Sequence, residues 1–360
     1  DMDLPLHILM ISSLIKIAII IGLLLIGVMA MILAERKVSG WIQDRYGPNR
    51  VGFRGMLQPL ADGIKFLAKE DLIPTHVDKA IYLIAPAIIL VPALVTCAVI
   101  PFGSAITIAG YTIPLQIADI NIGILYILAI TSLGVYGVVL GAWASNNKYS
   151  FLGGLRSSAQ MISYELSLGL SIIGVLKLSG SLSLREIASV QGPYPWHLNF
   201  LIHFPAFLTF TTAAFAETNR LPFDLAEAEQ ELVAGYHTEY SSMKFAMFFM
   251  AEYMNMIVGS AVAVTLFLGG WQFFGLEKLG GPLWGGLISF GIFFAKTAFF
   301  LFVFIWVRWT LPRFRYDQLM NLGWQFLLPT ALTMIVVTGT AWAATHSLVL
   351  VGVLNVVAAF

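Results

Sequence analysis

Charged residues, cysteine and nucleotide-binding motifs are scarce in this sequence of 360 residues. Only 11% of the residues are charged, against about 25% in soluble globular domains, and the net charge of +0 gives no support to nucleic-acid binding. The one cysteine, Cys97, excludes an internal disulfide and a thiolate cluster. The sequence has no glycine-rich phosphate loop and no H-E-x-x-H motif. We therefore expect no metal site and no redox centre in this chain, so that electron chemistry requires a partner.

Long apolar segments dominate the chain. Hydrophobic residues make up 58% of it, and stretches of about 20 apolar residues recur along its length, as in transmembrane helices. The sequence predicts an all-α, polytopic membrane protein with a single transmembrane domain over residues 1–360. The tail after Ser347 is too short for a full span, so it is either interfacial or part of a ninth helix. We expect about eight spans, near 9–34, 80–101, 121–143, 157–178, 199–217, 241–268, 285–309 and 325–345.

Basic residues are concentrated in the loops 36–79, 146–158, 217–244 and 313–321. The opposite loops contain only Arg185 and Lys278. By the positive-inside rule the basic loops face the cytoplasm, and with eight spans both ends face the other compartment. The first apolar stretch ends in Glu35-Arg-Lys rather than at a small-residue cleavage site, so we expect a retained helix.

The first cytoplasmic loop contains a segment with helical periodicity. Leu57, Leu60, Ile64 and Leu67 share one face of the stretch 56–70, which predicts an amphipathic helix in the membrane interface. Such a helix is either a lipid-surface anchor, which composition alone favours, or the frame of a lateral opening for a lipid-soluble ligand.

Three carboxylates fall in or at the ends of predicted spans: Glu165, Glu217 and Glu252. A charge at the centre of a transmembrane helix costs about 2.5–3.5 kcal/mol, and such residues usually face the bundle interior or a water path. The pattern therefore predicts proton or cation handling. The alternative is structural pairing, for example with Lys177 or Lys296.

An acidic loop follows Glu217. Asp224, Glu227 and Glu231 have the spacing of one helix face, and Glu229 points elsewhere. Like charges at this spacing disfavour a helix, so they need a cationic partner or shared protons. The interleaved apolar residues favour partial burial over a solvated loop.

Several long motifs together resemble the H subunit (subunit 1) of respiratory complex I, the proton-pumping NADH:quinone oxidoreductase. The resemblance runs from about Glu35 to Gln325. Its motifs are Glu35-Arg-Lys, Gly47-Pro-Asn-Arg-Val-Gly52, Gln58-Pro-Leu-Ala-Asp-Gly-Ile-Lys65, Ser145-Asn-Asn-Lys-Tyr-Ser150, Ser163-Tyr-Glu165, the stretch from Arg220 through Tyr240-Ser241, and Arg313-Phe-Arg-Tyr-Asp-Gln318.

The resemblance implies a role for each of these residue groups. Arg36, Arg45, Asp62 and Arg220 match polar residues of the quinone tunnel. Glu165, Glu217 and Glu252 match the carboxylates that lead from the quinone chamber into the proton path. The acidic loop that responds to quinone chemistry corresponds to Asp224, Glu227, Glu229 and Glu231. Some members carry a further carboxylate in the third span, where this sequence has Ser132, and a water held by Ser132 is the expected substitute.

The resemblance also implies the partners. This chain binds no cofactor itself and takes quinone as substrate, while NADH, FMN and iron–sulfur clusters belong to partner subunits. The partners are the peripheral-arm subunits of the quinone site, neighbouring small membrane-arm subunits and membrane lipid, without nucleic acid. The location is a bacterial inner (plasma) membrane, or an organelle inner membrane of bacterial descent. A protein of this kind is not active alone.

Two other functions stay open. The chain could be the equivalent subunit of a related membrane-bound hydrogenase or of a quinone reductase with another electron donor. It could also be a stand-alone ion transporter, although it lacks the internal repeat that many transporters show.

Overall fold

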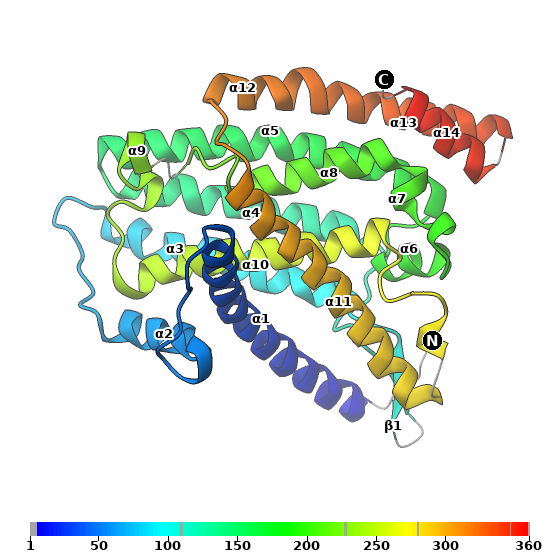
Figure 1. Cartoon of the computed structure of the whole chain (residues 1–360), viewed down its shortest axis with the longest axis horizontal. Helices are drawn as coiled ribbons and strands as arrows, with labels where there is room; N and C mark the ends of the chain where they lie inside the picture. Colours follow the sequence, from blue (N-terminus) through cyan, green and yellow to red (C-terminus); the bar gives the residue numbers. More distant parts are fainter. Residues whose placement is uncertain (1–5, 109–110, 227–228, 279–280, 346, 359–360) are drawn as a thin grey trace.

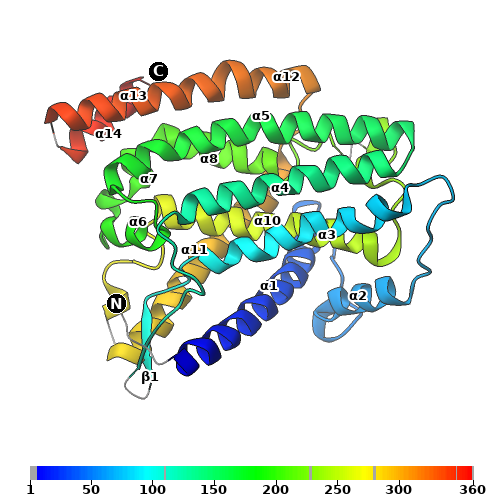
Figure 2. The same cartoon turned by 180° about the vertical axis from the view of Figure 1, so that it is seen from behind.

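Long helices make up most of the protein (Figures 1 and 2). The computed structural model describes residues 6–108, 111–226, 229–278, 281–345 and 347–358. Seven helices of these ranges are long and apolar enough to cross a membrane, which confirms a polytopic all-α fold. They are α1 (Leu6–Ile42), α3 (Lys79–Thr96), α4 (Gly123–Ala144), α5 (Lys148–Ser179), α10 (Ser242–Phe267), α11 (Gly281–Thr310) and a helix that runs from α12 (Tyr316–Asn321) through a π-helical turn (Leu322–Leu327) into α13 (Leu328–Thr345).

Local capping residues set the ends of several helices. The Asp78 side chain accepts a hydrogen bond from the backbone N–H of Ala80 at the start of α3. Asn147 caps α5 in the same way through the N–H of Tyr149. Such caps satisfy amide groups that have no partner within the helix. α5 ends where Gly180 adopts a left-handed conformation with φ of 68°, which glycine reaches without steric cost.

The span predicted at 199–217 is not one continuous helix. It consists of α7 (Asn199–Ile202) and α8 (Phe204–Glu217), with His203 between them. Pro205 lies in the first turn of α8, and proline has no N–H with which to continue a preceding helix. With 14 residues, α8 is shorter than the ~20 residues of a full span. It nevertheless lies beside α5 in the same layer as the long helices (Figure 1).

The long helices form a layered bundle. α3, α4, α5, α8 and α10 run side by side, whereas α1 and α11 cross them obliquely (Figures 1 and 2). Fully buried aromatic residues such as Tyr164, Phe210 and Phe267 join the layers. Because α1 and α11 are splayed from the bundle, the ends of these two helices leave room for polar side chains between them and α10.

The basic loops gather at one end of the bundle, at the left in Figure 1. This end carries α2 (Gln58–Ala68) and α9 (Glu229–Leu232). The opposite end carries α6 (Leu184–Val190) and the antiparallel strands β1 (Ala105–Ile108) and β2 (Tyr111–Pro114). Single turns complete the described elements: Phe53–Gly55, Cys97–Val99, Pro195–His197, Gly235–His237 and Leu276–Lys278.

The predicted amphipathic helix is confirmed as α2. Leu60, Ile64 and Leu67 of its apolar face are between 52% and 70% exposed, so the bundle does not cover this face. An uncovered apolar face at the end of a membrane bundle fits contact with lipid.

The C-terminal tail forms a separate short helix, α14 (Leu348–Ala358), which folds back against α13. It does not extend α13 into a ninth span. The buried side chain of Asn355 donates a hydrogen bond to the carbonyl of Ile202 (3.0 Å) and accepts one from Thr338 (3.1 Å). α14 thereby satisfies a carbonyl at the break between α7 and α8.

Both ends of α10 are fastened by charged side chains. Lys244 pairs with Asp71 (2.6 Å) near its start. At the other end, the ammonium of Lys296 donates to the carbonyls of Leu268, Gly270 and Gln272 at 2.6–3.0 Å. All three donors of Lys296 are thus used by backbone carbonyls, so the predicted alternative that Lys296 pairs with an intramembrane carboxylate is wrong.

Candidate functional site

A cavity of about 530 Å³ lies between α1, the loop after α1, α10 and α11. Its size falls in the usual range for small-molecule sites. Three arginines line it, and we call it the arginine cavity. Its lining residues are Ile32, Glu35, Arg36, Ser39, Arg45, Tyr46, Gly47, Pro48, Phe249, Tyr253, Arg308 and Trp309.

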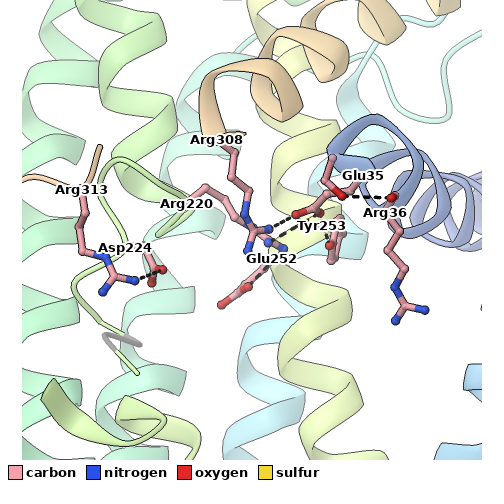
Figure 3. Close-up of polar contacts among 9 residues, drawn as sticks. Glu35, Arg36, Arg220, Asp224, Glu252, Tyr253, Arg308 and Arg313 are labelled. Atoms are coloured by element: carbon pink, nitrogen blue, oxygen red, sulfur yellow. Dashed lines mark hydrogen bonds and ion pairs between the residues drawn. The ribbon is translucent and has the colours of Figure 1, made fainter. Parts of the chain in front are cut away.

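Glu35 is the centre of the cavity's charged wall (Figure 3). Its carboxylate accepts hydrogen bonds from Arg308 and from the hydroxyl of Tyr253 (2.5 Å). Three elements that are far apart in sequence therefore meet at one carboxylate, which is only 7% exposed. Buried charges persist when they are paired and hydrogen-bonded in this way.

Arg220 lies behind this wall and joins it to Glu252 (Figure 3). One guanidinium nitrogen is 4.0 Å from Glu35 and the other is 3.6 Å from Glu252. The guanidinium stacks over the ring of Tyr253 at 4.3 Å, and Glu252 also accepts a hydrogen bond from Tyr236 (2.8 Å). At an effective dielectric constant of about 20, unit charges 4 Å apart interact by roughly 4 kcal/mol. A change of charge at Glu35 is therefore transmitted to Glu252 through Arg220.

The loop that carries Arg220 is fixed from α5. The amide of Gln160 donates to the carbonyls of Ala216 and Phe223, both at 2.8 Å. These bonds fasten the loop on either side of Arg220, whose own side chain is 6% exposed. The position of the guanidinium is therefore set by the bundle rather than by solvent.

Arg36 and Arg45 both line the arginine cavity, whereas Asp62 lies next to it on α2. Arg36 donates to Asp62 at 2.6 Å, and Gln58 donates to the same carboxylate at 3.3 Å. Burial alone would raise the pKa of Asp62, but the hydrogen bond and charge of Arg36 outweigh it and lower this pKa below its usual range. The resulting ion pair ties the interfacial helix α2 to the rim of the cavity.

The acidic loop does not form the predicted helical stripe. Asp224 lies outside α9 and pairs with Arg313 (2.9 Å), which precedes α12 (Figure 3). Glu231 lies in α9 and pairs with Arg156 of α5 (2.7 Å). The two carboxylates are thus separated because each is drawn to an arginine of a different element. Glu227 lies outside the described residues, and Glu229 begins α9 with a side chain outside them as well.

A second, smaller cavity of about 40 Å³ lies between α4, α5, α8, α10 and α11. Its wall is mostly aliphatic, but Glu165 and Glu217 both face it, and we call it the carboxylate cavity. The structure thus brings these two carboxylates together and places Glu252 in the arginine cluster instead. Among the other polar lining residues is Thr131, not Ser132. The expectation of a water held by Ser132 is therefore wrong, because neighbouring helix positions point in different directions.

Sequence reasoning did not single out Glu35, Tyr253, Arg308 and Arg313 as site residues. A signal was present for Arg308, because it falls inside the predicted span 285–309, where a charge usually has a function. Glu35 stands at the end of the first apolar stretch, where it resembles an interfacial charge. Its partner is 273 residues away, and periodicity within one chain does not reveal such a contact.

Known proteins share this sequence over most of its length. A family model described as NADH dehydrogenase matches residues 15–339. A second H subunit of the NADH-quinone oxidoreductase of Koribacter versatilis is 53% identical over 345 residues, covering 91% of this chain and 95% of the relative. A first H subunit of the same enzyme from Geobacter sulfurreducens is 53% identical over 341 residues (91% and 94%), and one from Cytophaga hutchinsonii is 49% identical over 340 residues (94% and 98%). The chain therefore belongs to the NADH dehydrogenase family and, within it, to the H subunits of NADH-quinone oxidoreductase.

Proposed function

We propose that the arginine cavity is part of a quinone path and that this chain couples quinone reduction to proton translocation. The observation that carries the proposal is the position of Arg220, which joins the wall of the cavity at Glu35 to the intramembrane carboxylate Glu252. The names of the relatives supply the substrate class, since they are NADH-quinone oxidoreductase subunits. The electrons come from FMN and iron–sulfur clusters in partner subunits.

The lining of the arginine cavity suits a quinone. Ile32, Phe249 and Trp309 offer apolar and aromatic contact to a hydrophobic ring, while Arg36 and Arg45 offer N–H donors. Quinone carbonyl oxygens accept hydrogen bonds, and reduction by two electrons makes them more negative until two protons are added. Arginine side chains near those oxygens stabilise the developing charge.

Charge coupling follows from the ion-pair chain. Negative charge that develops in the cavity competes with Glu35 for Arg308 and weakens the hold of these groups on one another. Arg220 then moves its share of pairing between Glu35 and Glu252, and the carboxylate that loses its cation takes up a proton. Glu165 and Glu217 continue this chain into the membrane. The acidic loop, with Asp224, Glu227, Glu229 and Glu231, responds to the same event through Arg313.

The ion pair of Arg36 with Asp62 positions the opening. Asp62 holds the Arg36 guanidinium at the rim and ties it to α2, so that the apolar face of α2 and the cavity lie next to each other. A lipid-soluble substrate can then pass from the membrane interface to the arginines without crossing water.

Photoaffinity labelling tests the quinone path. A quinone analogue with a photoreactive group is added to membranes that contain the assembled enzyme, and labelled peptides are identified by mass spectrometry. We expect label within residues 32–48 or at Trp309, and we expect excess natural quinone to prevent it. Arg45→Ala should lower this labelling severalfold because it removes a cavity donor. The matched control Arg54→Ala alters an arginine of the same loop that does not line the cavity. Label that is insensitive to both competitor and Arg45→Ala contradicts the proposal.

A further inference from the structure

The carboxylate cavity has a third polar side chain with free hydrogen-bonding capacity, Asn255 of α10. Within the described chain, its amide has no hydrogen-bond partner. The hydroxyls of Thr131 and Thr218, which also line the cavity, donate to the carbonyls of Ile127 and Phe215 in their own helices. Asn255 is therefore the neutral side chain whose amide is left available to the contents of the cavity. An amide without a partner in such a place costs about 1–3 kcal/mol, so water or a carboxyl group must satisfy it.

The cavity has room for water. A water molecule needs at least about 10–15 Å³ of such space and two to four polar partners. The volume of about 40 Å³ exceeds the first requirement, and Glu165, Glu217 and Asn255 supply the second. The amide of Asn255 offers both donors and an acceptor and does not titrate, so it can orient a water without competing for its proton.

Asn255 also occupies a particular position on α10. It lies three residues after Glu252, and residues at this spacing are neighbours on one helix face. Glu252 pairs with Arg220, while Asn255 faces Glu165 and Glu217. One turn of α10 thus separates the arginine cluster from the carboxylate cavity.

We infer that Asn255 is a positioning residue, which holds water between Glu165 and Glu217 and aligns it with Glu252 for proton exchange. In this exchange a water accepts a proton from the carboxylic acid on one side and donates another of its protons to the carboxylate on the other, so that water is regenerated. Asn255 neither gains nor loses a proton. The inference rests on the proposed coupling of quinone reduction to proton translocation.

Substitution of Asn255 in the assembled enzyme, reconstituted in liposomes, tests this role. Asn255→Leu keeps the approximate size of the side chain and removes its polar atoms. We expect it to lower the NADH:quinone reductase rate about tenfold or more and to raise the solvent deuterium isotope effect, because proton exchange becomes limiting. Asn255→Ser, which retains a donor and acceptor, should stay within about twofold of the wild-type rate. A purely structural residue would not show this rescue together with a change in isotope effect.

Ile257→Val is the matched control, because Ile257 lies on the same helix and contacts α1 at Gly27 instead of the cavity. If Asn255→Leu matches this control in rate, proton-to-electron ratio and isotope effect, the inference is wrong. Should Asn255→Leu fail to assemble, Asn255→Val is judged by the same comparison. Glu165→Gln and Glu217→Gln separate the two levels: if they are inactive while Asn255→Leu is normal, only the role of Asn255 fails. If the Gln variants retain full activity, the proposed coupling fails.

Discussion

Arg220→Ala is expected to lower the NADH:quinone reductase rate of the assembled enzyme by about 100-fold or more. The substitution removes the side chain that contacts both Glu35 and Glu252. Breaking a buried ion pair by removing one partner costs about 3–5 kcal/mol, and here two carboxylates lose the shared cation. They would then hold protons continuously and stop responding to the quinone.

Arg220→Lys refines this prediction. A lysine keeps the charge but lacks the planar fork that reaches two carboxylates and stacks on Tyr253, so we expect a loss of about tenfold. Arg315→Ala is the control, since the Arg315 side chain is 80% exposed and pairs only loosely with Asp317 (3.9 Å), and such surface pairs contribute little. Rates are measured on membranes with equal amounts of this chain and equal NADH oxidation by an artificial acceptor. An Arg220→Ala enzyme with more than half of the wild-type rate contradicts the role of the bridge.

Glu165→Gln and Glu217→Gln are each expected to reduce quinone reductase activity about tenfold or more and to lower the proton-to-electron ratio of the remaining turnover. Glutamine keeps the shape of glutamate but cannot release a proton, and general acid–base groups typically contribute at least about 100-fold to the rate of the step they serve. Both side chains face the carboxylate cavity, so either substitution interrupts the same exchange.

The control for these two variants is Glu186→Gln. Glu186 lies on the surface of α6, at the opposite end of the bundle from the basic loops. Proton uptake is followed with a pH-sensitive dye in liposomes during a counted number of NADH oxidations. Full rate and full ratio in both cavity variants would show that these carboxylates serve structure alone.

Much of the fold was predictable because the membrane imposes a simple pattern. Apolar stretches of about 20 residues identified all seven continuous spans, and a helical stripe of leucines identified α2. The break at His203 was not predicted, because α7 and α8 together have the length and hydropathy of one span. Its stability depends on a tertiary contact, the hydrogen bond from Asn355 to the carbonyl of Ile202.

The site was predictable only in part. The sequence identified carboxylates that are costly in a membrane, but it did not group them. Glu165 and Glu217 meet at one cavity, whereas Glu252 belongs to the Arg220 cluster. The pairing of Asp224 with Arg313, which are 89 residues apart, replaced the helical stripe that local spacing predicted. Such groupings depend on how distant helices pack, and local periodicity does not contain that information.

Membership of the family gives the cellular setting. The chain is a multi-pass inner-membrane protein and a subunit of NADH-quinone oxidoreductase, so its partners are other subunits of complex I. The predicted family and its membrane location are confirmed. The arrangement of the arginine cluster suggests how this protein, which we expect to act without a cofactor of its own, converts redox chemistry in its partners into a change of charge.

The most direct test of this coupling is the infrared difference spectrum of the assembled enzyme, recorded on reduction by NADH with and without quinone. Protonation of a buried carboxyl group gives a band in the carbonyl stretching region that shifts in heavy water. We predict such a band only when quinone is present and reduced, and we predict that Glu252→Gln or Arg220→Ala removes it. A spectrum without a quinone-dependent carboxyl band, or a band unchanged in both variants, would contradict the account.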